Sequence, residues 1–263
     1  MRGLRIFAGP SVYWLATFAV AAGLMAAGWS LLGLGYLALA VTIGLFSELE
    51  ERMHSLVSSS FSAVGVTSLV VAGSFILWLS RFGTGWYSLL LGKVEALIAT
   101  MPTWSETVKI EAKDILAQMP SAVVILLVLG LFFALLFQRR MMMILGMRRG
   151  HIYQLTKFQV PDAFIWVFLA ALAGTFLKVE TQWLATVSAN FLNVSIMVFF
   201  LQGLAVVGQY FISFRVNPFW QMVLTVILVS QLFLLVGIIG LADYWLHLRE
   251  RLAKRTEQID RNI

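Results

Sequence analysis

Asp243 is the residue whose type and position most directly suggest chemistry. It lies at the end of the last apolar run of the chain, and an ionisable side chain inside a bilayer is costly enough to indicate a function. Trp245, His247 and Arg249 follow closely and are typical of a membrane interface, where a carboxylate is solvated or pairs with an arginine. The position favours a structural anchor at the membrane boundary, with a functional carboxylate as the alternative.

A second group of polar side chains lies inside a long apolar run, at Asn190, Asn193 and Gln202, with Gly203 directly after the last of them. Asn190 and Asn193 are three residues apart, so they share one face of a helix. Amides in hydrocarbon need partners, and they either join helices or line a polar cavity. Contact between helices is the more frequent case, whereas a helix break at Gly203 favours a ligand site.

Small residues recur at four-residue spacing in the first apolar run, among them Ala22 and Ala26. Small side chains allow two helices to approach closely within a membrane. The pattern favours ordinary packing within the chain, and docking of a partner helix is the alternative.

The sequence lacks the patterns expected of a catalytic or metal centre. It has no cysteine, and its three histidines are far apart in sequence, without the paired histidines of a zinc-binding motif. Glu48, Glu50 and Glu51 stand near His54, but we predict a solvated turn for this stretch. We therefore expect a protein that is not an enzyme and that has no cofactor and no bound metal.

Composition indicates a membrane protein. Of the 263 residues, 60% are hydrophobic and only 12% are charged, and the mean hydropathy is +0.88. A soluble domain of this size needs a more polar exterior. The net charge of +6 comes from short blocks beside the apolar runs, without a basic patch interleaved with aromatic residues. This distribution is typical of topology signals and argues against nucleic-acid binding.

The apolar runs predict an all-α, polytopic transmembrane helical bundle of about seven spans, between six and eight, in a single membrane domain. Residues 82–119 mix charged and apolar side chains at helical spacing and predict an amphipathic helical segment on the external surface. The predicted spans are about 11–28, 31–47, 57–80, 120–137, 162–177, 183–214 and 219–243.

Charge predicts the orientation. The loop 138–160 carries basic residues and no acidic one, so the positive-inside rule places it, and the N-terminus, in the cytoplasm. Three further spans would then put the basic tail 246–263 outside, against the same rule. The run 183–214 is either one long tilted helix, about 48 Å in length, or a helix broken near Gly203, which would repair the count. The side of the C-terminus stays open.

Four short pieces carry a resemblance to a known family. They are Phe158–Asp162 with Trp166, Asn190–Asn193, Leu201–Val206, and Gly240–Trp245 followed by Arg249. In this order they resemble the YybS-like family of bacterial membrane proteins, which has no established function. That family is similar in general organisation to the substrate-binding subunits of energy-coupling-factor transporters and to the rod-shape protein MreD. The resemblance implies a multi-pass protein of the bacterial cytoplasmic (inner) membrane.

Two functions remain from these observations. The first is a scaffold or accessory subunit that acts with protein partners in the lipid bilayer, through its helix faces and loops. The second is a small-molecule binding or transport subunit, which resembles the energy-coupling-factor components and needs a cavity near Asn190, Asn193 or Gln202. We favour the first, because no charged residue is predicted with confidence at mid-membrane.

Overall fold

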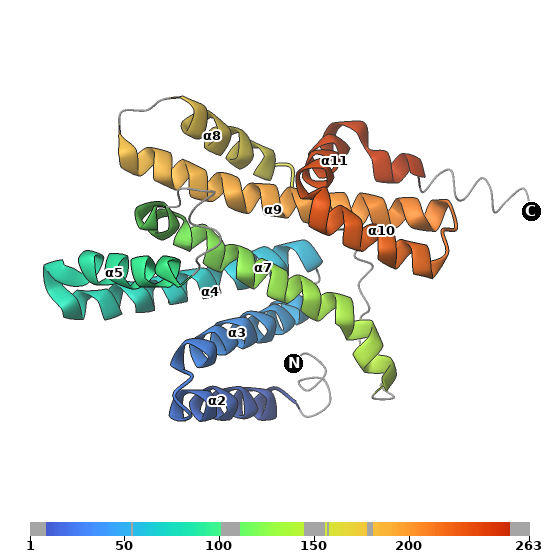
Figure 1. Cartoon of the computed structure of the whole chain (residues 1–263). Helices are drawn as coiled ribbons and strands as arrows, with labels where there is room; N and C mark the ends of the chain where they lie inside the picture. Colours follow the sequence, from blue (N-terminus) through green and yellow to red (C-terminus); the bar gives the residue numbers. More distant parts are fainter. Residues whose placement is uncertain are drawn as a thin grey trace, which may run out of the picture. The chain divides into compact units, whose positions relative to one another are not determined.

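The computed structural model describes residues 9–53, 55–100, 111–144, 156, 158–177 and 181–252. Within these ranges the regular structure is helical, as expected for an all-α membrane protein. The chain divides into two compact units, Met1–Ile152 and Tyr153–Ile263 (Figure 1). Each unit is described by itself below.

The described residues of the first unit form six helical elements. The elements are α2 (Pro10–Ala26), α3 (Ser30–Met53), α4 (Leu56–Leu79), the 3₁₀ helix η1 (Ser80–Gly85), α5 (Trp86–Ala99) and α7 (Ala112–Ile144). Helix α3 packs against both α2 and α4, η1 packs against α4 and α5, and α7 packs against α3, α4 and α5.

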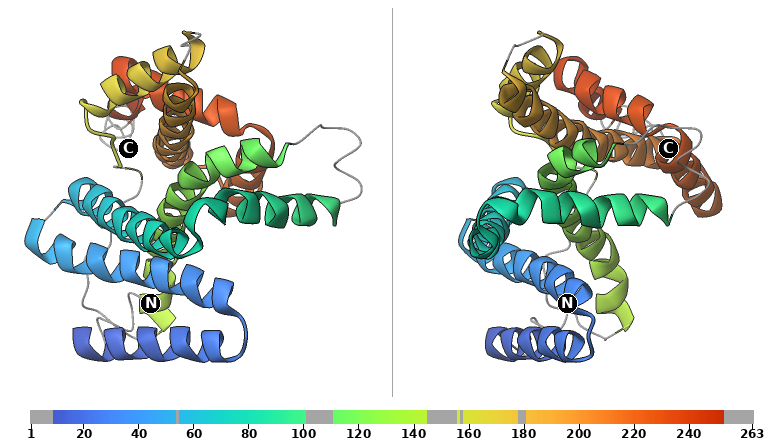
Figure 2. Two further views of the ribbon diagram at one scale, coloured as in Figure 1. Left: turned by 90° about the vertical axis from the view of Figure 1, so that its left-hand side faces the viewer. Right: turned by 60° about the vertical axis from the view of Figure 1, so that its left-hand side comes forward.

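The turn between α2 and α3 depends on a glycine. Gly28 has φ +85°, a left-handed conformation that costs glycine little because it has no Cβ. The chain reverses there, and Figure 2 shows α2 and α3 as neighbours joined by this short turn. The two helices are held by the buried Tyr13, whose hydroxyl donates to the carbonyl oxygen of Ala40 at 2.5 Å. At Gly44 the ring of Tyr13 occupies the space that a side chain would fill.

The second unit is organised around one long helix. It contains α8 (Phe164–Phe176), α9 (Gln182–Ser213), α10 (Pro218–Gln231) and α11 (Phe233–Leu246). Both α8 and α11 pack against α9 (Figure 1). Most of the described buried side chains of the unit lie on α9. The helix α9 continues through Gly203 without a break, as in the long-helix alternative.

The predicted count of about seven spans is not confirmed. Four described helices, α3, α4, α7 and α9, are long and apolar enough to cross a membrane, and a fifth candidate is the pair α10 and α11 taken as one span. Helices α2 and α8 are apolar but have only 17 and 13 residues. A helix of 13 residues is about 20 Å long, which is less than the roughly 30 Å of hydrocarbon.

Several predicted boundaries differ from the structure. The stretch 48–53, predicted as a turn, continues helix α3, whose last residues, Glu51, Arg52 and Met53, are exposed. Helix α7 begins at Ala112, so the end of the predicted surface segment 82–119 belongs to the same helix as the predicted span 120–137. The predicted span 219–243 is two helices that meet at 100°. Residues 101–110, 145–155 and 253–263 lie outside the described residues.

Candidate functional site

Three side chains from distant parts of the second unit meet in its interior. Asp243 on α11 accepts hydrogen bonds from Gln202 on α9 and from Arg249, which follows α11. The distances are 3.2 Å from Gln202 Nε2 and 2.7 Å from Arg249 Nε, both to Asp243 Oδ2. Arg249 Nη2 lies 2.7 Å from the same oxygen, and the Arg249 backbone N–H donates to Oδ1 at 3.1 Å. We call these three residues the Asp243 cluster.

The Asp243 cluster also binds the backbone that leads into α8. The side-chain oxygen of Gln202 accepts a hydrogen bond from the Val160 N–H at 3.1 Å. Arg249 Nη1 donates to the carbonyl oxygen of Phe158. The cluster thus joins three parts of the unit: the segment before α8, the middle of α9, and the end of α11.

The Asp243 cluster is buried, which distinguishes it from an anchor that is exposed to solvent. Gln202 is 1% exposed, and the side chains of Asp243 and Arg249 are 3% and 12% exposed. Of the two arrangements expected for Asp243, the structure contains the pairing with Arg249, and the paired carboxylate is buried. An ion pair removed from water keeps its charges only when both partners are well bonded, and here both are.

Two glycines allow the helices to come close enough for these bonds. A Cβ on Gly240 would lie 2.6 Å from the backbone nitrogen of Gly203 and would also overlap the carbonyl oxygen of Phe199. A Cβ on Gly203 would lie 2.8 Å from the carbonyl carbon of Val236. Backbone touches backbone at this crossing, which is the role of small residues where membrane helices meet. Gly203, where a break was the alternative to one long helix, is a point of contact within a continuous helix.

The cluster solves a problem specific to a membrane interior. With α9 centred in a bilayer, Gln202 lies about 7 Å from the midplane, because it is four to five residues past the centre of the helix. The non-helical backbone at Phe158–Val160 is at the same level, because the Val160 N–H bonds to Gln202. Non-helical backbone is tolerated at such depth only where protein groups satisfy its N–H and C=O groups. Gln202 and Arg249 supply those partners.

The other predicted residues do not join the cluster. The Asn190 side chain donates to the carbonyl oxygen of Thr186 in its own helix at 2.8 Å. Asn190 and Asn193 are 12 and 9 residues before Gln202, and 12 residues correspond to about 18 Å along the helix. Ala22 and Ala26, in the first unit, are exposed on α2, whereas Tyr13, Thr17 and Ala21 form its buried face.

Sequence reasoning missed the backbone partners and Gly240. Both lie in pieces that carried the family resemblance, Phe158–Asp162 and Gly240–Trp245, and the piece Leu201–Val206 meets them in the structure. The four pieces taken together were therefore the one signal in the sequence that could have indicated these contacts. Hydropathy could not show which of them touch.

Four hydroxyl groups in the described residues are buried without a hydrogen-bond partner. Ser59 and Thr67 are eight residues apart on α4, with buried Ala63 between them, so they share one face. Ser195 on α9 is fully buried, seven residues before Gln202. Such atoms often indicate a missing water, ion or ligand. The four belong to Ser59, Thr67, Ser68 and Ser195.

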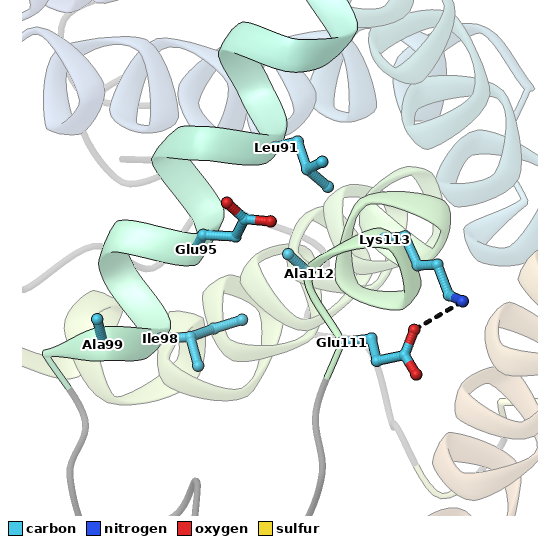
Figure 3. A pocket seen from close by; sticks show the side chains of 7 residues that line it. All are labelled: Leu91, Glu95, Ile98, Ala99, Glu111, Ala112 and Lys113. Atoms are coloured by element: carbon cyan, nitrogen blue, oxygen red, sulfur yellow. Dashed lines mark ion pairs between the residues drawn. The ribbon is translucent and has the colours of Figure 1, made fainter.

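A depression of about 460 Å³ lies between α5 and the start of α7. Figure 3 shows Glu95 directed toward Ala112, and the ion pair of Glu111 with Lys113 on the other side of Ala112. The pair is 2.6 Å long, but both side chains are 59% exposed, so it contributes little to stability. Within the described residues, no three His, Cys, Asp or Glu side chains form a group that could hold a metal ion.

These features define a helical membrane protein with an internal polar cluster. The model of a family described as "Predicted membrane protein (DUF2232)" matches residues 8–244, and the chain belongs to this family. No curated protein and no solved structure matches the chain.

Proposed function

We propose that the protein is a non-enzymatic membrane component that acts with partner proteins, as a scaffold or accessory subunit of a membrane complex. The observation that carries the proposal is the use of the Asp243 cluster within the chain itself. Both oxygens of Asp243 and both polar atoms of Gln202 have partners within the chain. Polar groups that bond to one another in this way stabilise a fold, and they are less available to a substrate.

The outward faces of the helices support the same proposal. Helix α2 places Ala22 and Ala26 on its exposed side, beside Leu15 and Phe18, which are 73% and 55% exposed. A small-residue face flanked by large apolar side chains accepts a second helix at short distance. A partner helix from another membrane protein fits this face.

Cross-linking in native membranes tests the proposal. Because the chain has no cysteine, A22C and A26C each carry a single thiol. With a maleimide photo-cross-linker we expect one discrete protein adduct at both positions. A21C is the matched control, because Ala21 is the neighbouring residue and is only 3% exposed. Adducts to lipid alone at positions 22 and 26, with intact expression, would contradict the partner role.

A second function has its own supporting observation. The chain before α8 is non-helical where it contacts α9, as the interrupted helices of transporters are at their binding sites. The hydroxyl of Ser195, which has no hydrogen-bond partner, would be available to a ligand in this region. This supports a small-molecule binding or transport subunit, similar to the energy-coupling-factor substrate components that the YybS-like resemblance implies. Native mass spectrometry of the gently solubilised protein tests it. A stoichiometric small molecule that is lost in S195A supports this function, and its absence from the wild-type protein opposes it.

For the cellular location we propose the bacterial inner membrane, with the N-terminus in the cytoplasm. Arg2, Arg5 and the basic residues of loop 138–160 support this orientation. A reporter that is active only in the cytoplasm, fused before Met1, tests this orientation. We expect the fusion to be active.

A further inference from the structure

We propose that α10 and α11 form a re-entrant hairpin, which enters the bilayer and leaves it on the side of the C-terminal end of α9. Ser213 and the basic tail then share one side of the membrane. This inference concerns topology and does not depend on the proposed function.

The path of α11 relative to α9 is the first argument. The Phe233 ring, at the start of α11, lies 4.4 Å from the Phe200 ring. Ten residues later, Asp243 bonds to Gln202, two residues from Phe200. A helix that crossed the membrane beside α9 would move along it by about 15 Å over ten residues. Helix α11 therefore runs across α9 at one level and does not descend along it.

The contacts of two glycines of α11 also place this helix at one level along α9. Gly240 lies against Phe199 and Gly203, and a Cβ on Gly237 would lie 3.9 Å from the carbonyl oxygen of Ile196. All of these partners lie within residues 196–203 of α9. The level of this crossing is close to the middle of the helix.

The length of α10 matches a return from the end of α9. From Ser213 back to the level of Phe200 is about 20 Å, and α10 has 14 residues, or about 21 Å. Figure 1 shows α10 starting near the C-terminal end of α9 and running back toward its middle. The chain then bends by 100° into α11. Helix α10 brings the chain to mid-membrane, and the bend keeps it there.

The residues after α11 return to the starting side. The Ser213 hydroxyl donates to the carbonyl oxygen of Leu252 at 3.2 Å. Ser213 is the last residue of α9. The chain therefore leaves at the end of α9 where it entered.

Helix α8 covers the N-terminal half of α9. On α8, the ring of Phe168 lies 5.3 Å from that of Phe199, and Gly174 is in contact with Ser188. Helix α8 thus follows α9 from its middle toward its N-terminal end, on the side that α11 does not reach. Helix α8 lies along the N-terminal half of α9, whereas α11 crosses α9 near its middle.

The charges agree with this path. Arg215 stands just after α9 and Arg251 follows α11, and both are exposed, so a re-entrant hairpin places the two on one side. The sequence of the tail adds Lys254 and Arg255. The positive-inside rule then assigns that side to the cytoplasm, and the conflict left by an odd number of passes disappears.

The exposed surface of α10 fits a lipid environment. None of its described side chains is buried, and Phe219, Met222 and Val226 are each about 60% exposed. Its polar residues bond locally: Gln221 Nε2 donates to the carbonyl oxygen of Val216 at 2.7 Å. Apolar side chains on several faces of one helix are stable against lipid chains.

Cysteine accessibility tests the hairpin in the full-length protein. We introduce F214C after α9, E250C after α11, and T181C before α9, each into the cysteine-free chain. A membrane-impermeant maleimide is applied to sealed vesicles of each orientation. We expect F214C and E250C to react in the same vesicles, and T181C to react in the opposite ones.

The bend supplies an independent measurement. Q231C, at the end of α10, should not react in the vesicles that label T181C. Labelling of E250C or Q231C together with T181C would overturn the proposal, because the pair would then cross the membrane. Size-exclusion profiles equal to that of the wild-type protein show that each variant is folded. The cross-linking result at α2 is independent of this outcome.

Discussion

Gln202 Nε2 donates a hydrogen bond to Asp243 Oδ2 across 3.2 Å, although the two residues are 41 positions apart. The other end of the same amide accepts from the Val160 N–H. One side chain therefore connects the middle of α9 to α11 and to the chain before α8. This cluster, the crossing of α9 and α11, and the hydrogen bond from Tyr13 to Ala40 in the first unit can each be tested by substitution.

Replacing Gln202 should destabilise the second unit. Q202L leaves the Val160 N–H without its partner and removes a donor from a buried carboxylate, so we expect a loss of about 2–4 kcal/mol. Thermal unfolding in detergent measures it. Q182L is the matched control, because Gln182 lies exposed on the same helix, and its unfolding temperature should equal that of the wild-type protein. Equal temperatures for both variants would show that the amide contributes nothing.

The ion pair should be strongly non-additive. D243L leaves Arg249 charged and buried, and R249L leaves Asp243 in the same state, so each should cost about 3–5 kcal/mol. The double variant D243L/R249L should cost less than the sum of the two. It should not recover fully, because the carbonyl group of Phe158 also loses its donor. A double-mutant cycle on unfolding free energies measures the coupling, and a cycle that sums to zero would contradict the pairing.

A methyl group at the helix crossing should force α9 and α11 apart. G240A places a Cβ against the backbone of Phe199 and Gly203, and overpacking of this kind costs about 1–3 kcal/mol, and more where backbone must move. Thermal unfolding and protease sensitivity of the second unit report the change. G73A is the control: Gly73 on α4 has no atom within 4 Å of an added Cβ, so its effect should be small.

The hydroxyl of Tyr13 should stabilise the α2–α3 pair. Y13F removes its bond to the carbonyl oxygen of Ala40 and keeps the ring, so we expect a loss of about 1 kcal/mol. Thermal unfolding again measures it. Y210F serves as the comparison, because Tyr210 is 46% exposed and should tolerate the change. A larger loss in Y210F than in Y13F would contradict this account.

Part of the candidate site could be predicted from sequence. An amide and a carboxylate within apolar runs are unusual enough to be noticed one residue at a time, and Arg249 is close enough to Asp243 in sequence to be its partner. The backbone partners could not be predicted, because Phe158 is 91 residues from Arg249 and no local pattern connects them. Asn190 and Asn193 matched Gln202 in residue type but not in level along α9.

The sequence by itself determined the class of the protein and most of its helices. Hydropathy and helical spacing are local properties, and they are sufficient to predict an all-α membrane protein and a long apolar run over 183–214. Only the tertiary structure decided that Gly203 is a contact and not a break, because this depends on Gly240 approaching it. It also decided that α10 and α11 meet at 100°. The hydropathy of a segment measures the affinity of that segment for lipid. It does not determine where the chain bends, because the bend depends on packing against other helices.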